Sequence, residues 1–489
     1  AGPDAAARLA ACRAKHPETA GVGPWLDTAC SHWAPANVGH GFYPYGILPL
    51  AAVRVAAVAA ERFGVPHAAS YAEIPTVGRI AATLADLVSL ACAFLLGRSL
   101  GGRRAGLVAA ALYAFAILPL QLARFYTVDP FATAFAALAL VLAVRAVERG
   151  KAADLVAFGL ASGLAAACKL SLAPLLGLAL PIALLAPVRP GGSAPALPRG
   201  LLRAAGACAV AGIAAFAMFR IAQPILFAGP RLVDVAPAPG AIELFRQLAG
   251  QLDGSADLPP AWQWIGRTRW VDPLRNLLLF GLGPAFAVAA VAGVALAAWR
   301  AVAGPPFRRR TSIVLLAATL GYGAWIGGQF VSSMRYWLPL YPVLAAFGGW
   351  VLVVGAARLR RRVRVARLLP AAAIAVSAVA AVAWLAVPLS APTRLWASHW
   401  MLERVPAGAS APLAGEAGPL PRRVNWAIDG AVPPAPRELA TRTTIATSGT
   451  IDRLELRLAT DAPDADIPAA RAVTASLVRD DGTVLLPPT

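Results

Sequence analysis

The sequence predicts an all-α polytopic membrane protein with loops on its outer face and a small β-rich domain at its C-terminus. Of its 489 residues, 58% are hydrophobic and only 14% are charged, and the mean hydropathy is +0.63. Soluble domains carry about 25% charged residues, and a single soluble core stops growing beyond about 250–300 residues. A chain of this length and composition therefore places most of its surface in lipid.

Ten apolar windows approach or reach the roughly 20 residues that a helix needs to cross a bilayer. They cover residues 78–97, 105–123, 130–147, 155–168, 171–188, 203–223, 275–298, 312–331, 337–356 and 369–388. The chain opens at Ala1 without Met and without an apolar signal segment, so we expect an eleventh helix upstream of it. The helical bundle is predicted over 78–388, and it includes a long outer loop at 229–273.

The net charge of +19 admits two interpretations. Basic surfaces bind nucleic acid, whereas membrane proteins collect Lys and Arg in their cytoplasmic loops. Here the basic residues cluster between the apolar windows, and no basic face with interleaved aromatic residues is present, so we expect no nucleic-acid partner. The clusters are Arg98, Arg103 and Arg104; Arg149 and Lys151; Arg189, Arg199 and Arg203; Arg300 and Arg308 to Arg310; and Arg358, Arg360 to Arg362, Arg364 and Arg367.

Alternating the ten windows across the membrane places all these clusters on one face, which is then cytoplasmic. Residues 46–63 are apolar but contain Arg54, so we expect a helix that lies in the outer interface rather than a further span. The chain is thus predicted to be a multi-pass protein of the cell membrane with an extracytoplasmic C-terminus. The segments predicted on the outer face are 1–77, 124–130, the loop near Lys169, 229–273, 332–337 and 389–489.

The segment 389–489 differs in character from the bundle. The stretch RTTIATSGTIDRLELRLAT alternates polar and apolar residues, as strands with one buried face do. The stretch AVTASLVRDDGTVLLP places two short apolar runs on either side of an Asp-Gly pair, which is typical of a β-hairpin. A β-rich extracytoplasmic domain is therefore predicted here.

The first outer stretch contains several residues that could bind a substrate or a divalent metal. The candidates are His16, Glu18, His32 and His40. Their spacing is specific for no metal, so we leave the metal site unassigned and count His16 and His40 among the substrate-binding candidates. Cys12 and Cys30 share this stretch, and a disulfide between them is compatible with an extracytoplasmic location.

Ionisable residues at membrane depth cost about 2.5–3.5 kcal/mol or more each, so each one suggests a function. Lys169 interrupts an otherwise apolar region and could bind an anionic group or reach the outer interface at a helix break. Asp129 precedes Pro130, which is a helix start signal, and its carboxylate is expected at the outer membrane surface.

Arg335 and Tyr336 lie between two apolar windows at the outer face, within an aromatic belt. A guanidinium group can bind a phosphate with two parallel hydrogen bonds. The alternative is that Arg335 serves as an interfacial anchor. We therefore count Arg335 and Tyr336 among the substrate-binding candidates.

Several segments in order along the chain resemble the C-type membrane glycosyltransferases, most of all the bacterial branch similar to dolichyl-phosphate-mannose–protein mannosyltransferases and to aminoarabinose transferases. The resemblance covers nearly residues 12–420. The segments that carry it are KHPET, NVGHGFYPYGILPL, GRIAATLADL, GRSLGGRRAGLVAAALYAFAILPLQLARFYTVDPFATAF, GLASGLAAACKLSLAPL, DLPPAWQWIGRTRWVDPLRNLLLFGLGP, MRYWLPLYP and ASHWMLERVPAGASAPLAGE.

The resemblance implies an enzyme that transfers a sugar, as a hexosyl group, from a polyprenyl-phosphate carrier to a protein, lipid or glycan acceptor outside the cytoplasm. It implies one catalytic acid in the first outer segment, at Glu18, and a second at Asp129. Lys169, Arg335 and Arg267 match basic positions suited to the lipid phosphate. The sequence departs from the family at Glu18-Thr19, where the family usually has Asp-Glu.

Two other classes of function fit the same sequence. A transporter or flippase for a lipid-linked or anionic substrate would use Lys169 to line its pathway, although the repeated halves typical of transporters are not seen. An inactive membrane scaffold would present the β-rich domain to a partner. The enzyme hypothesis predicts that Glu18, Asp129, Lys169 and Arg335 converge on one outer-facing site.

Overall fold

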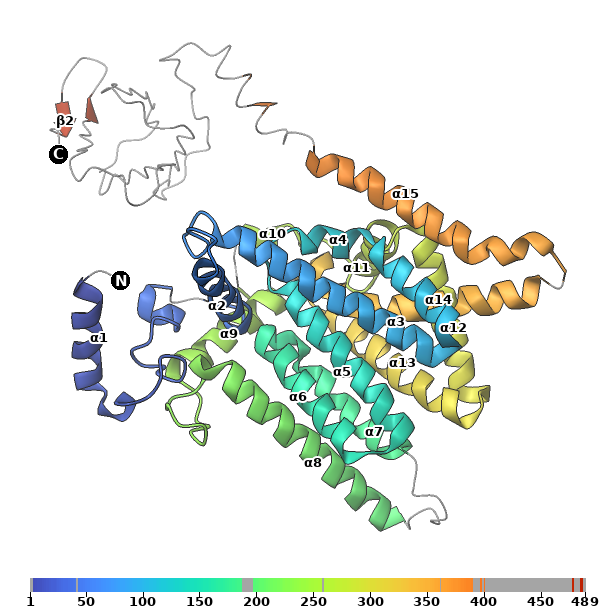
Figure 1. The fold of residues 1–489 in the computed structure, drawn as a ribbon, viewed down its shortest axis with the longest axis horizontal. Coiled ribbons are helices and arrows are strands. Elements are labelled where there is room, and N and C mark those ends of the chain that lie inside the picture. Colours follow the sequence, from blue (N-terminus) through green and yellow to red (C-terminus); the bar gives the residue numbers. More distant parts are fainter. Residues whose placement is uncertain are drawn as a thin grey trace. The chain divides into compact units, whose positions relative to one another are not determined.

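The computed structural model describes residues 3–40, 43–186, 197–256, 259–360 and 362–389, together with Trp396, Ala397, Trp400 and two short strands near the C-terminus. The chain separates into two units, Ala1–Val387 and Pro388–Thr489, and each is considered by itself. In the first unit the described residues are predominantly helical (Figure 1). The predicted all-α class is therefore confirmed for this part of the chain.

The helices of the first unit follow one another along the chain, joined by loops and by short 3₁₀ segments. The α-helices are α1 (Pro3–Lys15), α2 (Leu48–Arg62), α3 (Ile74–Ala114), α4 (Ile117–Ala123), α5 (Asp129–Arg149), α6 (Ala152–Cys168), α7 (Ala179–Leu185), α8 (Leu197–Ala222), α9 (Pro239–Asp253), α10 (Pro259–Trp262), α11 (Val271–Asn276), α12 (Pro284–Ala303), α13 (Pro306–Gly327), α14 (Tyr341–Leu359) and α15 (Leu369–Leu389). The 3₁₀ segments are η1 (Pro17–Thr19), η2 (Pro35–Val38), η3 (Leu170–Leu178), η4 (Pro224–Leu226), η6 (Met334–Leu340) and η7 (Arg364–Leu368), and η5 (Leu277–Gly281) is a π-helical segment.

Among the described residues, six helices are long and apolar enough to cross a membrane, judged by length and composition. They are Ile74–Ala114, Asp129–Arg149, Gly200–Ala222, Pro284–Ala303, Met334–Leu359 and Arg364–Val387. The apolar helices Ala152–Cys168 and Leu170–Leu185 are shorter. The chain is thus a multi-pass membrane protein, whereas the count of ten or eleven spans stays a prediction.

Helix α3 is a hairpin rather than one straight rod. Gly102 has a φ of +80°, which interrupts the helical backbone and which glycine adopts without steric cost. The two halves then pack closely, because a Cβ on Gly97 would lie 2.8 Å from the Cβ of Ala109. The apolar windows predicted at 78–97 and 105–123 therefore correspond to the first half of α3 and to its second half followed by α4.

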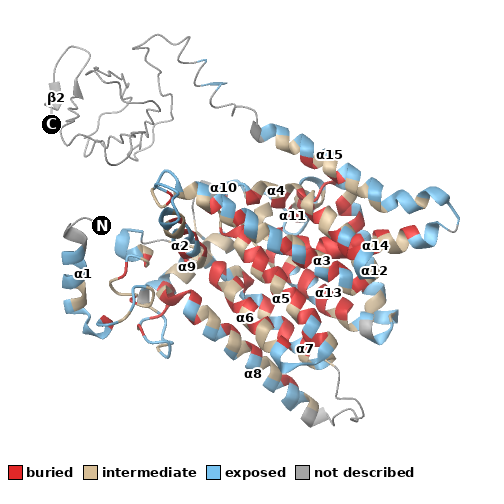
Figure 2. Cartoon of the chain, viewed as in Figure 1, coloured by how far each residue is buried: buried red, intermediate tan, exposed pale blue. Residues whose placement is uncertain are grey.

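The centre of the bundle is formed by α5 and by the helix that begins with η6 and continues as α14. In both, 72% of the most apolar window is buried within the protein, against 17% for α8 and α15 (Figure 2). Apolar residues exposed on α8 and α15 suit a lipid surface. The two central helices carry predicted site residues, because Asp129 is the first residue of α5, and Arg335 and Tyr336 lie in the first turn of η6.

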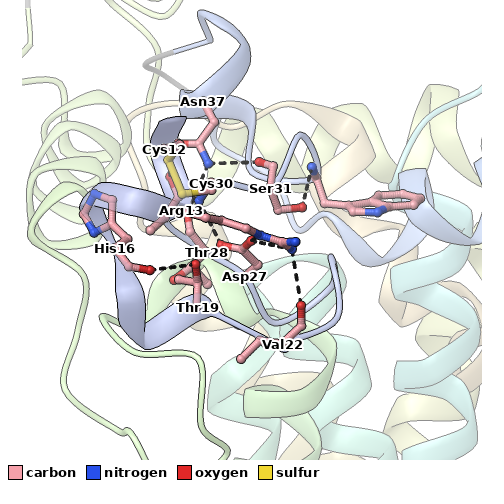
Figure 3. A network of polar contacts seen from close by, with 12 residues as sticks. Cys12, Arg13, His16, Thr19, Val22, Asp27, Thr28, Cys30, Ser31 and Asn37 are labelled. Atoms are coloured by element: carbon pink, nitrogen blue, oxygen red, sulfur yellow. Dashed lines mark hydrogen bonds and ion pairs between the residues drawn. A yellow bond between two sulfur atoms is a disulfide. The ribbon is translucent and has the colours of Figure 1, made fainter. Parts of the chain in front are cut away.

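Residues 1–77, which are predicted to lie on the outer face and are called the first outer segment below, contain a disulfide between Cys12 and Cys30 (Figure 3). The fully buried Asp27 carboxylate accepts hydrogen bonds at 3.1 Å from Arg13 Nε and Nη2, and one at 2.9 Å from the Cys30 amide. Asn37 Nδ2 donates to the Ser31 carbonyl at 2.9 Å. A buried charge is tolerated only when it is paired and hydrogen-bonded, so these contacts fix the segment as a unit.

Removing this disulfide with Cys12→Ser/Cys30→Ser is expected to loosen the first outer segment. The cross-link joins residues 18 apart, and closing a loop of about that length stabilises a fold by about 3 kcal/mol. Hydrogen exchange of the amides between Asp27 and Asn37 should therefore accelerate by about 100-fold. Cys208→Ser, which removes a free cysteine, is the matched control and should leave this exchange unchanged. Unaltered protection in the double variant would contradict the prediction.

The helix predicted over 46–63 is found as α2, whose buried face includes Pro49, Val53 and Ala57, and its location in the outer interface stays a prediction. Arg54 is exposed and donates a hydrogen bond to the Ala69 carbonyl. In the second unit, β1 (Leu477–Val478) pairs antiparallel with β2 (Val484–Leu486), which agrees with the predicted hairpin around the Asp-Gly pair. The rest of the predicted β-rich domain lies outside the described residues.

Candidate active site

A buried ion pair lies where α5 begins and α6 ends. Lys169 Nζ is 2.7 Å from Asp129 Oδ1, and the two side chains are 9% and 3% exposed. The residues are 40 positions apart in the sequence, so only the packing of α5 against α6 brings them together. A charge in such surroundings is costly unless it is paired, and each side chain satisfies this need of the other.

The local sequence explains why both residues sit at helix ends. Pro130 follows Asp129 at the start of α5, where its missing N–H costs nothing. Lys169 has an extended backbone, with φ −150° and ψ 107°, between the end of α6 and the start of η3. The predicted helix start at Asp129 and the predicted helix break at Lys169 are both confirmed.

Two further side chains complete the cluster from the turn before α14. Lys169 Nζ lies 4.2 Å from the centroid of the Tyr336 ring, and the Arg335 guanidinium lies 5.6 Å from the same centroid. Arg335 Nη2 donates a hydrogen bond to the Tyr45 hydroxyl at 3.0 Å. The structure thus joins residues from four separate segments, at Tyr45, Asp129, Lys169 and Arg335–Tyr336.

The charges in this cluster do not balance. Asp129 neutralises Lys169, whereas Arg335 forms no ion pair with any carboxylate in the described part of the chain. Its guanidinium is half-buried, and the Tyr45 hydroxyl that accepts its hydrogen bond is neutral. One net positive charge therefore remains, which favours an anionic ligand.

Tyr45 belongs to the first outer segment and is half-buried in the cluster. Burial raises the pKa of its hydroxyl, and the nearby Arg335 charge opposes this rise. The Tyr43 ring lies edge-on to Tyr45 with centroids 6.5 Å apart. Burial, and then the neighbouring hydroxyls of Tyr126 and Tyr45, also raise the pKa of Tyr43. Both phenols are therefore neutral hydrogen-bonding groups at neutral pH.

Glu18, the predicted acid of the first outer segment, is exposed and pairs with a neighbouring histidine. Glu18 Oε1 lies 3.0 Å from His16 Nδ1, and the two side chains are 53% and 46% exposed. Hydrogen bonds from its own backbone amide and from His16 lower the pKa of Glu18. Across the described residues, no hydrogen bond or ion pair joins either side chain to the cluster. Their predicted catalytic and binding roles stay predictions.

In the described part of the chain, His40 and Arg267 also make no hydrogen bond or ion pair with the cluster. His40 is exposed. Arg267 Nε donates to the Gln263 carbonyl at 3.1 Å, and its guanidinium lies 5.2 Å from the Trp264 ring centroid. No group of three metal-ligating side chains is found among the residues that the structure describes. Of the predicted residues, the structure therefore brings together Asp129, Lys169, Arg335 and Tyr336.

Sequence reasoning did not single out Tyr45, although it lies in the segment NVGHGFYPYGILPL that carries part of the family resemblance. A tyrosine in a loop rich in aromatic residues gives no signal of its own. Its role depends on Arg335, which is 290 positions away in the sequence, and no local pattern encodes such a pairing.

Residues 74–198 match the family model described as dolichyl-phosphate-mannose-protein mannosyltransferase. The match confirms the resemblance to the C-type membrane glycosyltransferases. The matched residues include Asp129 and Lys169 but neither Tyr45 nor Arg335. No curated protein matches the chain.

Several solved structures resemble the fold. The apo oligosaccharyltransferase of Archaeoglobus fulgidus has a TM-score of 0.47 and 17% identity, over 78% of this chain and 55% of that chain. Its complex with zinc and sulfate has a TM-score of 0.46 and 18% identity, over 79% of this chain and 52% of that chain. ArnT from Cupriavidus metallidurans bound to undecaprenyl phosphate has a TM-score of 0.42 and 17% identity, over 74% of this chain and 63% of that chain. The chain spans about half the length of the archaeal oligosaccharyltransferase chains.

Proposed function

We propose that this protein transfers a hexosyl group from a polyprenyl-phosphate donor to an acceptor at the extracytoplasmic face of the membrane. The observation that carries the proposal is the cluster of the buried Asp129–Lys169 pair with the uncompensated Arg335. The family match over residues 74–198 supports it, because the matched segment contains that ion pair. A protein, lipid or glycan would serve as the acceptor.

Arg335 is the residue best suited to the donor phosphate. Its guanidinium has several N–H donors, and Tyr45 accepts from only one of its terminal nitrogens. A planar guanidinium binds a phosphate with two parallel hydrogen bonds. Lys169 Nζ contacts the same Tyr336 ring at 4.2 Å from its centroid and forms an ion pair with Asp129. Together the two cations would stabilise negative charge on the leaving phosphate.

Asp129 is the carboxylate that the cluster offers for catalysis. In a single displacement the acceptor O–H gives its proton to a carboxylate, and the acceptor oxygen forms a bond to the anomeric carbon of the sugar. The bond between that carbon and the phosphate oxygen breaks, and the polyprenyl phosphate leaves with the electron pair. Asp129 would accept the proton or orient Lys169 toward the phosphate, and either role requires its negative charge.

The extracytoplasmic location rests on the distribution of arginine along the central helices. Asp129 starts α5, Lys169 follows α6 and Arg335 precedes α14. The opposite ends of the same helices carry Arg149, Lys151 and Arg358. Basic residues collect on the cytoplasmic side, so the cluster would face outward, and the chain end after α15 would be extracytoplasmic as well.

The direct test is a donor screen with purified full-length protein in lipid nanodiscs. Polyprenyl-phosphate mannose, glucose and other hexosyl donors would be supplied together with protein, lipid and glycan acceptors, and release of polyprenyl phosphate would be followed by chromatography. At least one donor should be turned over, at a rate well above that of protein denatured by heat. The absence of release with every polyprenyl-phosphate hexose tested would overturn the proposal.

A further inference from the structure

Residues 45–47 pass between the ends of α6 and α8 and reach the candidate active site. The Gly46 amide donates to the Cys168 carbonyl at 3.1 Å, and Cys168 directly precedes Lys169. The Ile47 amide donates to the side-chain oxygen of Gln223 at 2.9 Å. Tyr45, the next residue toward the N-terminus, accepts the hydrogen bond from Arg335. This short segment therefore connects the two cationic residues of the cluster.

The backbone of Gly46 lies in close contact with the backbone at the end of α6. A Cβ added at this position would lie 1.5 Å from the Ala167 carbonyl oxygen, which is a fixed backbone atom. Only glycine allows the segment to lie this near to the end of α6. The position of Tyr45 is therefore set by backbone contacts, and it has little freedom to adjust if one of them is lost.

Gln223 supplies the other contact from just beyond the end of α8. Its side chain is buried, with a residue exposure of 4%, and its backbone amide is already bonded to the Phe219 carbonyl at 2.8 Å. The Gln223 side-chain oxygen accepts from the Ile47 amide, which is itself buried. A buried N–H that loses its acceptor carries the full cost of desolvation, so without this oxygen the segment is expected to shift.

We propose that Gln223 is a positioning residue of the active site, which holds residues 45–47 so that Tyr45 orients Arg335 for the donor phosphate. The proposal rests on the proposed function in its choice of ligand. Within the described part of the chain, Gln223 forms no hydrogen bond with Arg335 or Lys169, and it acts through the Ile47 backbone. Loss of its oxygen should weaken donor binding more than it slows the chemical step.

A second hydrogen bond between the same parts of the chain provides a matched control. Trp25 Nε1 donates to the Ile221 carbonyl at 2.8 Å, two residues before Gln223. It also ties the first outer segment to the end of α8, but it is far along the chain from Tyr45. If Gln223 served only to fasten the outer segment, Trp25→Phe and a Gln223 variant would have the same effects.

The kinetic test compares Gln223→Leu, Gln223→Glu and Trp25→Phe. Leu is shorter than Gln and has no hydrogen-bond acceptor, whereas Glu keeps the length of Gln and retains an acceptor. We expect Gln223→Leu to raise KM for the donor about tenfold with kcat within twofold, as loss of one buried hydrogen bond allows. Gln223→Glu should recover most of that loss, and Trp25→Phe should keep the wild-type KM. Equal effects of Gln223→Leu and Trp25→Phe, or no effect of either, would overturn the proposal.

A double-mutant cycle with Tyr45→Phe tests whether Gln223 acts through Tyr45. Tyr45→Phe keeps the ring and removes the oxygen that accepts from Arg335. Residues that act in one chain of contacts give non-additive effects, so Gln223→Leu should raise KM little further in the Tyr45→Phe background. Full additivity of the two changes would contradict the mechanism, even if each single variant alone raises KM.

A readout without turnover separates this inference from the proposed function. Tyr45 would be replaced by 3-fluorotyrosine, and its ¹⁹F resonance would be recorded in the full-length protein in nanodiscs. Gln223→Leu should shift or broaden the resonance, while Trp25→Phe leaves it in place. An unchanged resonance in Gln223→Leu would overturn the positioning role. A shifted resonance in a protein that turns over no donor would instead retain the positioning role and reject the proposed function.

Discussion

Asp129→Asn is expected to reduce kcat for release of polyprenyl phosphate by about 10²- to 10⁴-fold, the range typical for loss of a proton-transferring group. The amide retains an oxygen that can accept from Lys169, so the shape of the cluster should survive. It retains no negative charge, and it can neither accept a proton nor hold the Lys169 ammonium by charge. Steady-state kinetics at saturating donor concentration measure this loss.

The same substitution should also lower stability, because it leaves the Lys169 ammonium buried without a counter-charge. Breaking a buried pair in this way costs about 3–5 kcal/mol. Asp129→Asn/Lys169→Met removes both charges and should recover much of the thermal stability while activity remains lost. Recovery of stability without recovery of turnover would show that the loss of activity does not follow from unfolding.

Asp86→Asn is the matched control for Asp129→Asn. Asp86 lies in α3 and accepts a hydrogen bond at 2.6 Å from the Tyr113 hydroxyl, so it is another carboxylate bonded within the bundle but outside the cluster. We expect turnover within about twofold of wild type, since an exchange that keeps a hydrogen-bond acceptor usually costs little. Full turnover in Asp129→Asn, or an equal loss in Asp86→Asn, would reject Asp129 as the catalytic carboxylate.

Arg335→Met is expected to reduce kcat/KM for the donor by about 100- to 1,000-fold. This is the typical effect of removing one preorganised group that stabilises developing negative charge. Met keeps the apolar stem of the side chain but has neither the guanidinium charge nor a hydrogen-bond donor. Arg335→Lys should recover only part of the loss, because an ammonium group cannot bind a phosphate through two fixed parallel N–H groups.

Arg267→Met tests the competing basic candidate from the sequence. Arg267 is exposed and contacts Gln263 and Trp264 rather than the cluster, so its removal should change kcat/KM by less than about twofold. The comparison uses donor titrations with the same acceptor for all variants. A loss at Arg267→Met as large as that at Arg335→Met would indicate that the donor phosphate binds at the long outer loop instead.

The amino-acid sequence by itself determined that the bundle is mostly helical, where α5 begins and where α6 ends. Ala- and Leu-rich windows, Pro130 at a helix start and the break at Lys169 are local features, and local backbone preferences and hydrophobicity act over a few residues. The arginine clusters likewise predicted the direction of the chain through the membrane, because that bias follows from charge alone. These features suffice to place Asp129, Lys169 and Arg335 at helix ends that share one predicted face of the membrane.

Only the tertiary structure decided which of these residues meet. Asp129 pairs with Lys169 because α5 packs against α6, and Arg335 meets Tyr45 because residues 45–47 are held against Cys168 and Gln223. Glu18 lies in the same outer segment as Tyr45, yet it bonds to His16. Contacts between residues tens or hundreds of positions apart depend on how the helices pack, and no local pattern in the sequence records that packing.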